Sequence, residues 1–213
     1  MRTSAYALIA LIAAAAGFGI YRYGVEPQLV SAPQAPSPFE PPSGSEPPEI
    51  LPDFTLADLE GAPRSIRSWP GKSMIVNFWA TWCAPCRREI PLLKEIQHEY
   101  GDEGFQLVGV AVDFREDVES YLAEIGVNYP VLVGEQDGLE AVSQFGQGSL
   151  GLPFTVFTDN QHRIVALHLG ELHRTQTETL LEAVRRVNSG ELTPLAARTE
   201  AASELAKLRT PDA

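Results

Sequence analysis

Cysteine and histidine are scarce in this sequence, and acidic residues far outnumber basic ones. The 213 residues include 2 cysteines and 4 histidines, and 28 acidic residues against 16 basic ones give a net charge of −12. This balance argues against nucleic acid as a partner. A structural zinc site needs about four Cys or His ligands, and no histidine stands in tight ligand spacing. Covalent haem attachment fails because Arg87, not histidine, follows Cys86. We therefore expect no metal and no cofactor.

The two cysteines lie where a predicted strand gives way to a predicted helix. Residues 74–78 are an apolar, β-branched and aromatic run typical of a buried strand. Pro85 falls in the first helical turn, where its missing N–H costs nothing. Free N–H groups and the positive end of the helix dipole would stabilise a thiolate at Cys83. Helical spacing follows Cys86, with apolar residues at Ile90, Leu93, Ile96 and Tyr100. We interpret the pair as a dithiol/disulfide redox centre.

An apolar run near the N-terminus predicts export of the chain. It covers residues 5–21, with Arg2 before it and Arg22 after it, and its length of about 17 residues is at the lower limit for spanning a bilayer. Residues 1–25 are an uncleaved anchor or a signal peptide with a cleavage site near Ala14-Ala15-Ala16. The interfacial Tyr21 and Tyr23 favour the anchor. The predicted location is periplasmic or extracytoplasmic, attached to the cytoplasmic membrane, or soluble there after cleavage.

Composition divides the rest of the chain into a linker, a domain and a tail. Proline recurs through residues 26–50 among Ser, Gly, Glu and Gln, which predicts an extended, partly polyproline tether. A proline-rich recognition ligand is the alternative to a plain spacer. Residues 51–189 have the patterns of a folded domain. Residues 190–213 carry an Ala/Leu pattern that could form an extra helix.

Within residues 51–189, predicted strands alternate with predicted helices, which implies an α/β fold with a partly parallel sheet. The turn at Glu60-Gly61 predicts an N-terminal hairpin, and Asp159-Asn160 predicts a second hairpin. The predicted strands are 53–58, 64–68, 74–79, 105–112, 129–133, 153–158 and 163–169. The predicted helices are 83–100, 116–125, 139–145 and 175–187.

Two motifs carry a family resemblance. With Trp82-Cys83-Ala84-Pro85-Cys86 and Gly151-Leu152-Pro153, the sequence resembles the thioredoxin superfamily. Residues 78–91 (FWATWCAPCRREIP) are more similar to the membrane-anchored TlpA/ResA-like thiol–disulfide oxidoreductases, and the resemblance covers about residues 50–189. It implies a thioredoxin-like α/β fold with an N-terminal β-hairpin, a β-α insertion around residues 112–133, and a central mixed sheet flanked by helices.

The same resemblance implies roles for individual residues. Cys83 would be the exposed nucleophile and Cys86 the buried resolving thiol. Pro153 matches the family's cis-proline, which would turn the Leu152 backbone toward an extended substrate. The alternative is a trans-proline at the start of a strand. The position of Trp82 beside Cys83, apart from the resemblance, predicts that it covers the exposed sulfur and forms part of the docking surface, with plain packing as its alternative.

A departure from ordinary thioredoxin points to Glu89. Asn77 stands where thioredoxin has a buried aspartate, and an amide cannot accept the proton of the resolving thiol. Glu89 lies three residues after Cys86, at the edge of the helix's apolar stripe, where partial desolvation would raise its pKa. In TlpA/ResA-like proteins the matching glutamate tunes the cysteines. The alternative is a solvated surface glutamate paired with Arg88 or Lys94.

Together these features predict an exported, membrane-anchored enzyme that reduces disulfides in extracytoplasmic proteins through Cys83 and Cys86. Apocytochrome c is one candidate among its exported, disulfide-containing partners. The resemblance further implies a membrane electron donor of the CcdA/DsbD type. Two alternatives stay open: an oxidase or isomerase that donates its disulfide, and a non-catalytic binding module on a thioredoxin scaffold. Residues Cys83, Cys86 and Pro153 together argue against the binding module, because a binder would not need all three.

Overall fold

The computed structural model describes residues 48–146 and 151–209. The predicted anchor and almost all of the predicted linker lie outside these residues. Within the part of the chain that is described, no helix is long and apolar enough to cross a membrane.

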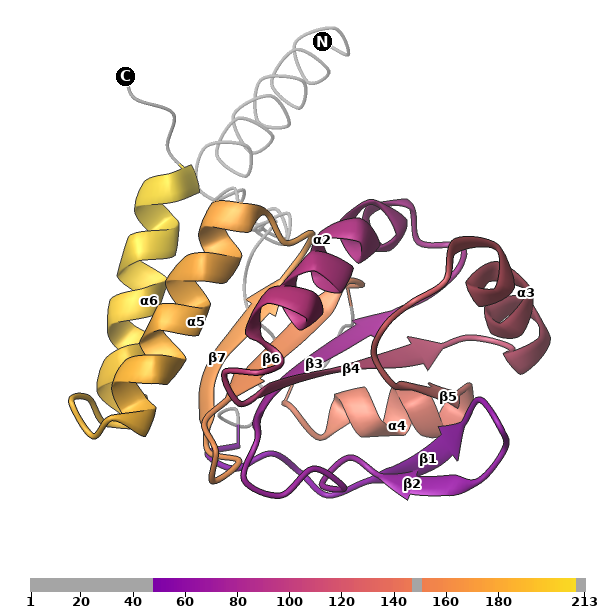
Figure 1. Cartoon of the computed structure of the whole chain (residues 1–213), viewed down its shortest axis with the longest axis horizontal. Coiled ribbons are helices and arrows are strands. Elements are labelled where there is room, and N and C mark those ends of the chain that lie inside the picture. Colours follow the sequence, from indigo (N-terminus) through magenta and orange to yellow (C-terminus); the bar gives the residue numbers. More distant parts are fainter. Residues whose placement is uncertain (1–47, 147–150, 210–213) are drawn as a thin grey trace, which may run out of the picture. The chain divides into compact units, whose positions relative to one another are not determined.

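Seven strands form one mixed sheet in the order β2-β1-β5-β4-β3-β6-β7 (Figure 1). The central strands β3, β4 and β5 run parallel, and every other neighbouring pair is antiparallel. This arrangement confirms the predicted α/β fold with an N-terminal hairpin and a central mixed sheet. The strands are β1 (Thr55–Asp58), β2 (Pro63–Ser65), β3 (Ser73–Trp79), β4 (Phe105–Val112), β5 (Val131–Gly134), β6 (Phe154–Thr158) and β7 (Ile164–Leu169).

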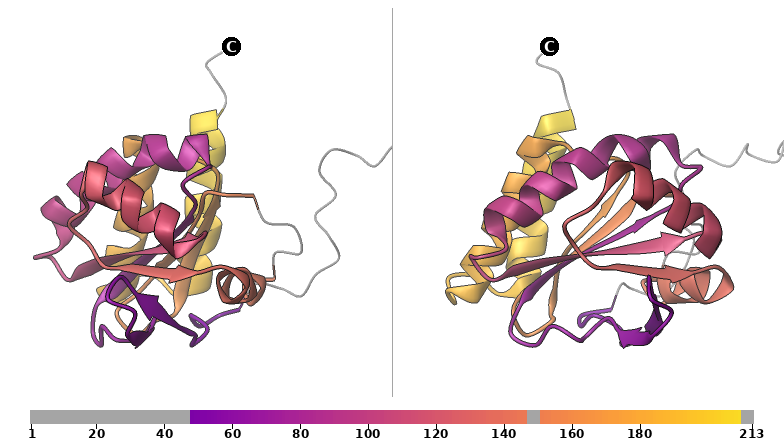
Figure 2. Two further views of the ribbon diagram at one scale, coloured as in Figure 1. Left: turned by 90° about the vertical axis from the view of Figure 1, so that its right-hand side faces the viewer. Right: turned by 45° about the vertical axis from the view of Figure 1, so that its right-hand side comes forward.

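Helices cover both faces of the sheet, because the buried strands are apolar on both faces. Side chains alternate along β3: Ile75 and Trp79 belong to the hydrophobic cluster that includes α2, α3, α5 and α6. Met74, Val76 and Phe78 belong to a second cluster that includes α4. Figure 2 shows α2 and α3 on one side of the sheet and α4 on the other. The helices of the described residues are α2 (Ala84–Tyr100), α3 (Arg115–Ile125), α4 (Gln136–Ser143), α5 (Arg174–Asn188) and α6 (Pro194–Arg209).

The predicted tail forms α6, and this helix is part of the domain. Ala197 and Ala201 are buried in the same cluster as α5, and the Arg198 guanidinium donates a hydrogen bond to the backbone oxygen of Ile164 at 2.8 Å. α6 thus packs against the domain, beyond the predicted domain end at residue 189. Small residues on α6 allow close approach to α5, which the Ala/Leu pattern alone did not reveal.

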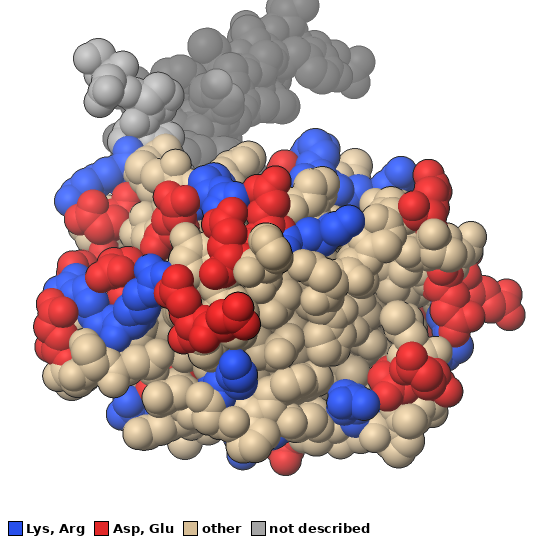
Figure 3. Space-filling view, in the orientation of Figure 1, with Lys and Arg blue, Asp and Glu red and all other residues tan. Residues whose placement is uncertain are grey.

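Ion pairs join α5 to α2 and to the turn that follows α2. Arg174 pairs with Glu95 and Glu99, and Arg185 pairs with Glu103. Acidic and basic side chains interleave on the left of the view in Figure 3, where α5 and α6 lie in Figure 1. Each exposed pair contributes little to stability, so apolar burial, not charge, holds the helices on the sheet.

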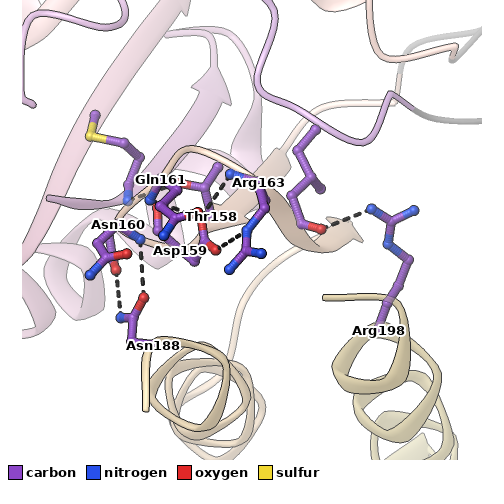
Figure 4. A network of polar contacts seen from close by, with 10 residues as sticks. Thr158, Asp159, Asn160, Gln161, Arg163, Asn188 and Arg198 are labelled. Carbon is purple, nitrogen blue, oxygen red and sulfur yellow. Dashed lines mark hydrogen bonds and ion pairs between the residues drawn. The ribbon is translucent and has the colours of Figure 1, made fainter. Parts of the chain in front are cut away.

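A buried polar network lies at the β6–β7 turn (Figure 4). The Asp159 side chain is fully buried, and its Oδ1 accepts hydrogen bonds from the backbone N–H groups of Gln161 and Arg163. Its Oδ2 accepts from the Arg163 guanidinium at 2.6 Å. Asn188 at the end of α5 accepts from the Asn160 N–H and donates to the Ser73 hydroxyl at the start of β3. The network ties this turn to α5 and β3.

Substitution of Asp159 by alanine should lower the free energy of unfolding by about 3 kcal/mol, because two backbone donors and part of a guanidinium lose their buried acceptor. Chemical denaturation measures the change. The control is Glu178→Ala, which removes an exposed partner 3.9 Å from Arg174 and should cost less than about 1 kcal/mol. Equal costs for the two substitutions would contradict the structural role of Asp159.

Candidate active site

The two cysteines form a disulfide at the N-terminus of α2. Their Cα atoms are 5.3 Å apart, and Cys83 is the N-cap residue of the helix. The Cys83 sulfur accepts a hydrogen bond from the backbone N–H of Cys86 at 3.3 Å. β3 ends at Trp79 and α2 begins at Ala84, so the redox pair lies at the predicted strand–helix junction. A thiolate at Cys83 would face the N–H groups and the positive end of the helix dipole.

The surroundings of the pair are more buried than the sequence suggested. Cys83 is only 5% exposed and Cys86 is fully buried. The prediction of a buried Cys86 is confirmed, whereas Cys83, which was expected to be exposed, is also buried. Cys83 packs into the hydrophobic cluster below α2, which explains the difference. Trp82 is 71% exposed, and this contradicts the alternative in which it serves only core packing.

Pro153 lies at the start of β6, next to the end of β3. The Leu152–Pro153 peptide bond is cis, so the trans-proline alternative is wrong. The register that pairs Asn77 with Thr155 and Phe78 with Phe154 places Pro153 at the level of Trp79. The Pro153 carbonyl accepts a hydrogen bond from the backbone N–H of Gly170 at 2.8 Å. The loop thus enters the sheet at the same end as the disulfide, and Leu152 is half-buried there.

Glu89 lies inside the protein, one helical turn beyond Cys86. It is 1% exposed. One carboxylate oxygen accepts a hydrogen bond from the Asn77 side-chain amide at 2.7 Å, and the other accepts from the backbone N–H of Leu172 at 2.8 Å. The same Asn77 nitrogen donates to the Thr155 hydroxyl at 3.0 Å. The carboxylate therefore connects α2 with β3 and with the loop before α5.

The alternative of a surface ion pair at Glu89 is wrong. Arg88 points outward to Glu171, and Lys94 donates to the backbone oxygen of Ile125. Burial raises the pKa of Glu89 to about 7, although the hydrogen bonds from Leu172 and Asn77 act in the opposite direction. A nearby Glu171 carboxylate raises this pKa further. Glu89 can therefore exchange a proton near neutral pH.

Three groups around Glu89 and its partner Asn77 were not found from the sequence: the Leu172 N–H, Tyr129, and Thr155, which contacts Asn77. Tyr129 is buried, and that burial, followed by the nearby carboxylate of Glu89 and by Tyr121, raises its pKa. Thr155 and Leu172 lie 78 and 83 residues from their partners along the chain. Only the alternation of β3 offered a signal, because it places Asn77 on the same face as Ile75 and Trp79, toward α2.

The raised pKa of Glu89 predicts a pH-dependent stability. An unfolded glutamate titrates near 4.5 and the folded one near 7, so the folded protein holds more protons between these values. The stabilisation is fully present below about pH 4.5 and is lost as pH rises through about 7. Relative to Glu89→Gln, the wild type should lose about 3 kcal/mol of unfolding free energy across this range.

Denaturant unfolding of the oxidised protein at a series of pH values measures this difference. Glu95→Gln removes a carboxylate from the exposed side of the same helix and serves as the matched control. A wild-type curve parallel to that of Glu89→Gln from pH 4.5 to pH 8 would contradict the buried, protonated carboxyl.

Comparison with known proteins agrees with this geometry. The Redoxin family model matches residues 45–184. The thiol–disulfide oxidoreductase ResA of Geobacillus thermodenitrificans is 30% identical over 135 residues, which are 63% of this chain and 75% of that protein. Among solved structures, a thioredoxin-family thiol:disulfide interchange protein from Chlorobium tepidum is 30% identical with a TM-score of 0.57, covering 66% of this chain and 97% of that one. A secreted thiol–disulfide isomerase from Corynebacterium glutamicum is 26% identical with the same TM-score, covering 67% and 93%. The chain belongs to the Redoxin family and is a thiol–disulfide oxidoreductase, ResA-like in sequence and thioredoxin-like in fold.

Proposed function

We propose that this oxidoreductase acts as a reductant of disulfides in exported proteins. The observation that carries the proposal is the buried carboxyl of Glu89 behind a cysteine pair at a helix N-terminus. A resolving thiol that is fully buried needs a local proton acceptor before it can attack. Glu89 offers one whose pKa of about 7 lies near the working pH of an extracytoplasmic compartment.

The reaction proceeds in two exchange steps. The Cys83 thiolate of the reduced protein attacks one sulfur of the client disulfide, forms a mixed disulfide and expels the other client sulfur as a thiolate. The Cys86 thiol then passes its proton to Glu89 and attacks the Cys83 sulfur. This second step forms the Cys83–Cys86 disulfide and releases the remaining client thiol. Two electrons pass from the protein to the client, and a separate dithiol donor must return them.

The proposed location rests on the sequence that precedes the folded domain, and the proposed donor rests on the family resemblance. The apolar segment 5–21 anchors the chain in the cytoplasmic membrane, and the proline-rich segment 26–50 is a tether. A tether raises the effective concentration of the domain near a membrane electron donor, which we assign to the CcdA/DsbD type. Clients are exported proteins with disulfides, apocytochrome c among them.

A second candidate is an isomerase or oxidase. The likeness to the secreted thiol–disulfide isomerase from Corynebacterium glutamicum favours it. The midpoint potential of the Cys83–Cys86 couple separates the two directions, since about 30 mV corresponds to 1.4 kcal/mol for this two-electron couple. Redox titration should place it nearer to about −270 mV, typical of thioredoxin, than to about −120 mV, typical of a strong oxidant. A value near the latter would assign the protein to disulfide donation.

The roles of the two sulfurs predict opposite behaviours of the single variants. Pre-reduced Cys86→Ser should form a stable mixed disulfide with insulin through Cys83, because the resolving step is missing. Cys83→Ser should trap no client. It should reduce insulin no faster than the variant in which both Cys83 and Cys86 are replaced by serine. Mass spectrometry detects the trapped complex. A complex trapped by Cys83→Ser instead would reverse the assignment.

Glu89 should control the second step through its proton. In the wild type the release of client thiol after mixed-disulfide formation should speed up as pH rises through about 7. Glu89→Gln should remove this inflection and slow the step by about tenfold or more, in the range of general base catalysis. Stopped-flow measurement of both steps gives the comparison, with Glu95→Gln as the control. An unchanged pH profile in Glu89→Gln would exclude the proton role.

A further inference from the structure

Two exposed aromatic side chains leave the sheet at neighbouring strand ends. Trp82 is 71% exposed and Phe114 is 61% exposed. Among the described residues, the other exposed large apolar side chains are all aliphatic. Trp82 precedes the nucleophile Cys83, whereas Phe114 comes from the loop between β4 and α3. Neither the oxidoreductase chemistry nor the packing of the core accounts for Phe114.

The register of the sheet brings the two loops level with each other. β3 and β4 are parallel, and each residue of β3 pairs with the residue 32 positions later, from Ser73 with Phe105 to Trp79 with Ala111. The same offset continues beyond the strands, where Thr81 binds Asp113. Trp82 follows Thr81 and Phe114 follows Asp113 in their loops, so the two aromatic residues leave the sheet at the same level.

Asp113 fixes both loops through one buried carboxylate. Its Oδ2 accepts hydrogen bonds from the Thr81 backbone N–H at 2.8 Å and from the Thr81 hydroxyl at 2.6 Å. Its Oδ1 accepts from the Phe114 backbone N–H at 2.9 Å. The following Arg115 donates to the backbone oxygens of Asp58 and Leu59. Phe114 therefore has an exposed side chain on a backbone that is held on both sides.

Both loops then turn toward the same face of the sheet. The helices that follow them, α2 and α3, contribute Cys86, Ile90, Val118 and Leu122 to one hydrophobic cluster. Figure 1 and Figure 2 both show α2 and α3 on the same side of β3 and β4. Exposed aromatics on a fixed backbone lose little conformational entropy when they bind a partner, which is why such residues dominate binding surfaces.

We propose that Trp82 and Phe114 form a client-binding pair for an apolar side chain adjacent to the cysteine that Cys83 attacks, and that Asp113 is the positioning residue of this pair. The proposal rests on the proposed disulfide reductase function. The occupant is the client polypeptide itself, because any disulfide that reaches the sulfur of Cys83 must bring its flanking residues to this aromatic surface. The pair thus selects clients whose reactive cysteine has an apolar neighbour.

Two peptides test the selectivity of the pair. Each carries one cysteine as a mixed disulfide with glutathione, flanked by leucine in one peptide and by serine in the other. The pre-reduced full chain attacks each peptide, and stopped-flow measurement gives the second-order rate constants. The wild type should prefer the leucine peptide by about fivefold or more, and Phe114→Ala should lose most of this preference. Leu195→Ala, which removes a 69% exposed side chain from α6, should keep it.

The outcomes separate this inference from the function on which it rests. A wild type that reduces neither peptide would overturn both. Reduction of both peptides with equal rate constants, or a preference that persists in Phe114→Ala, would overturn the client-binding pair alone. Dimerisation that depends on Phe114, with an unaltered peptide preference, would likewise overturn it and assign the surface to a second copy of the chain.

The role of Asp113 has its own matched variants. Thr81→Ser keeps a hydroxyl for the carboxylate, whereas Thr81→Val has the same shape and loses it. The leucine preference should fall in Thr81→Val and in Asp113→Ala but survive in Thr81→Ser. A general loss of stability would change both peptide rate constants alike, so their ratio reports the positioning. Equal ratios in Thr81→Val and Thr81→Ser would overturn the role of Asp113.

Discussion

The carboxyl of Glu89, buried between α2 and the sheet, is the interaction on which the active site depends. Its two oxygens accept hydrogen bonds from β3, through Asn77, and from the loop before α5, through Leu172. These bonds compensate part of the desolvation and hold the side chain in place, while burial still raises its pKa to about 7. A carboxyl that is neutral and ionised in similar amounts near pH 7 can accept and return a proton. Because the folded-state pKa is raised, the free energy of unfolding falls as pH rises through about 7.

The register of three neighbouring strands gathers the functional groups at one end of the sheet. β3 leads directly into the cysteine pair, antiparallel β6 begins beside its end with Pro153, and parallel β4 ends beside it with Asp113 and Phe114. A shift of one residue in the pairing of β3 with β6 would place Asn77 and Thr155 on opposite faces of the sheet. The buried polar network around Asp159 joins the opposite ends of β3 and β6. The redox pair and the proposed client-binding pair thus lie at the same end of one sheet.

Most elements could be predicted because their signals are local. The continuous apolar run of β3 and the helical spacing after Cys86 gave the right types and nearly the right ends. Differences occur where tertiary packing overrides a local signal. α4 begins at Gln136 instead of residue 139, and Gly138 is buried within the helix. β5 begins after Pro130, because pairing with β4 starts at Val131. The extent of α6 depends on small residues that fit against α5.

By itself the sequence determined the chemistry of the site: a cysteine pair at a helix N-terminus, a proline preceding a strand, and a glutamate one turn along the helix. The two cysteines and Glu89 lie close together in the chain, so periodicity and spacing reveal them, whereas Pro153 lies far along the chain and was identified from the family resemblance. Only the tertiary structure decided how deeply Cys83 and Glu89 are buried, which donors meet the carboxylate, and that Phe114 stands level with Trp82. Burial and hydrogen bonding between residues some 30 to 80 positions apart arise from strand order and register, and no local pattern encodes them.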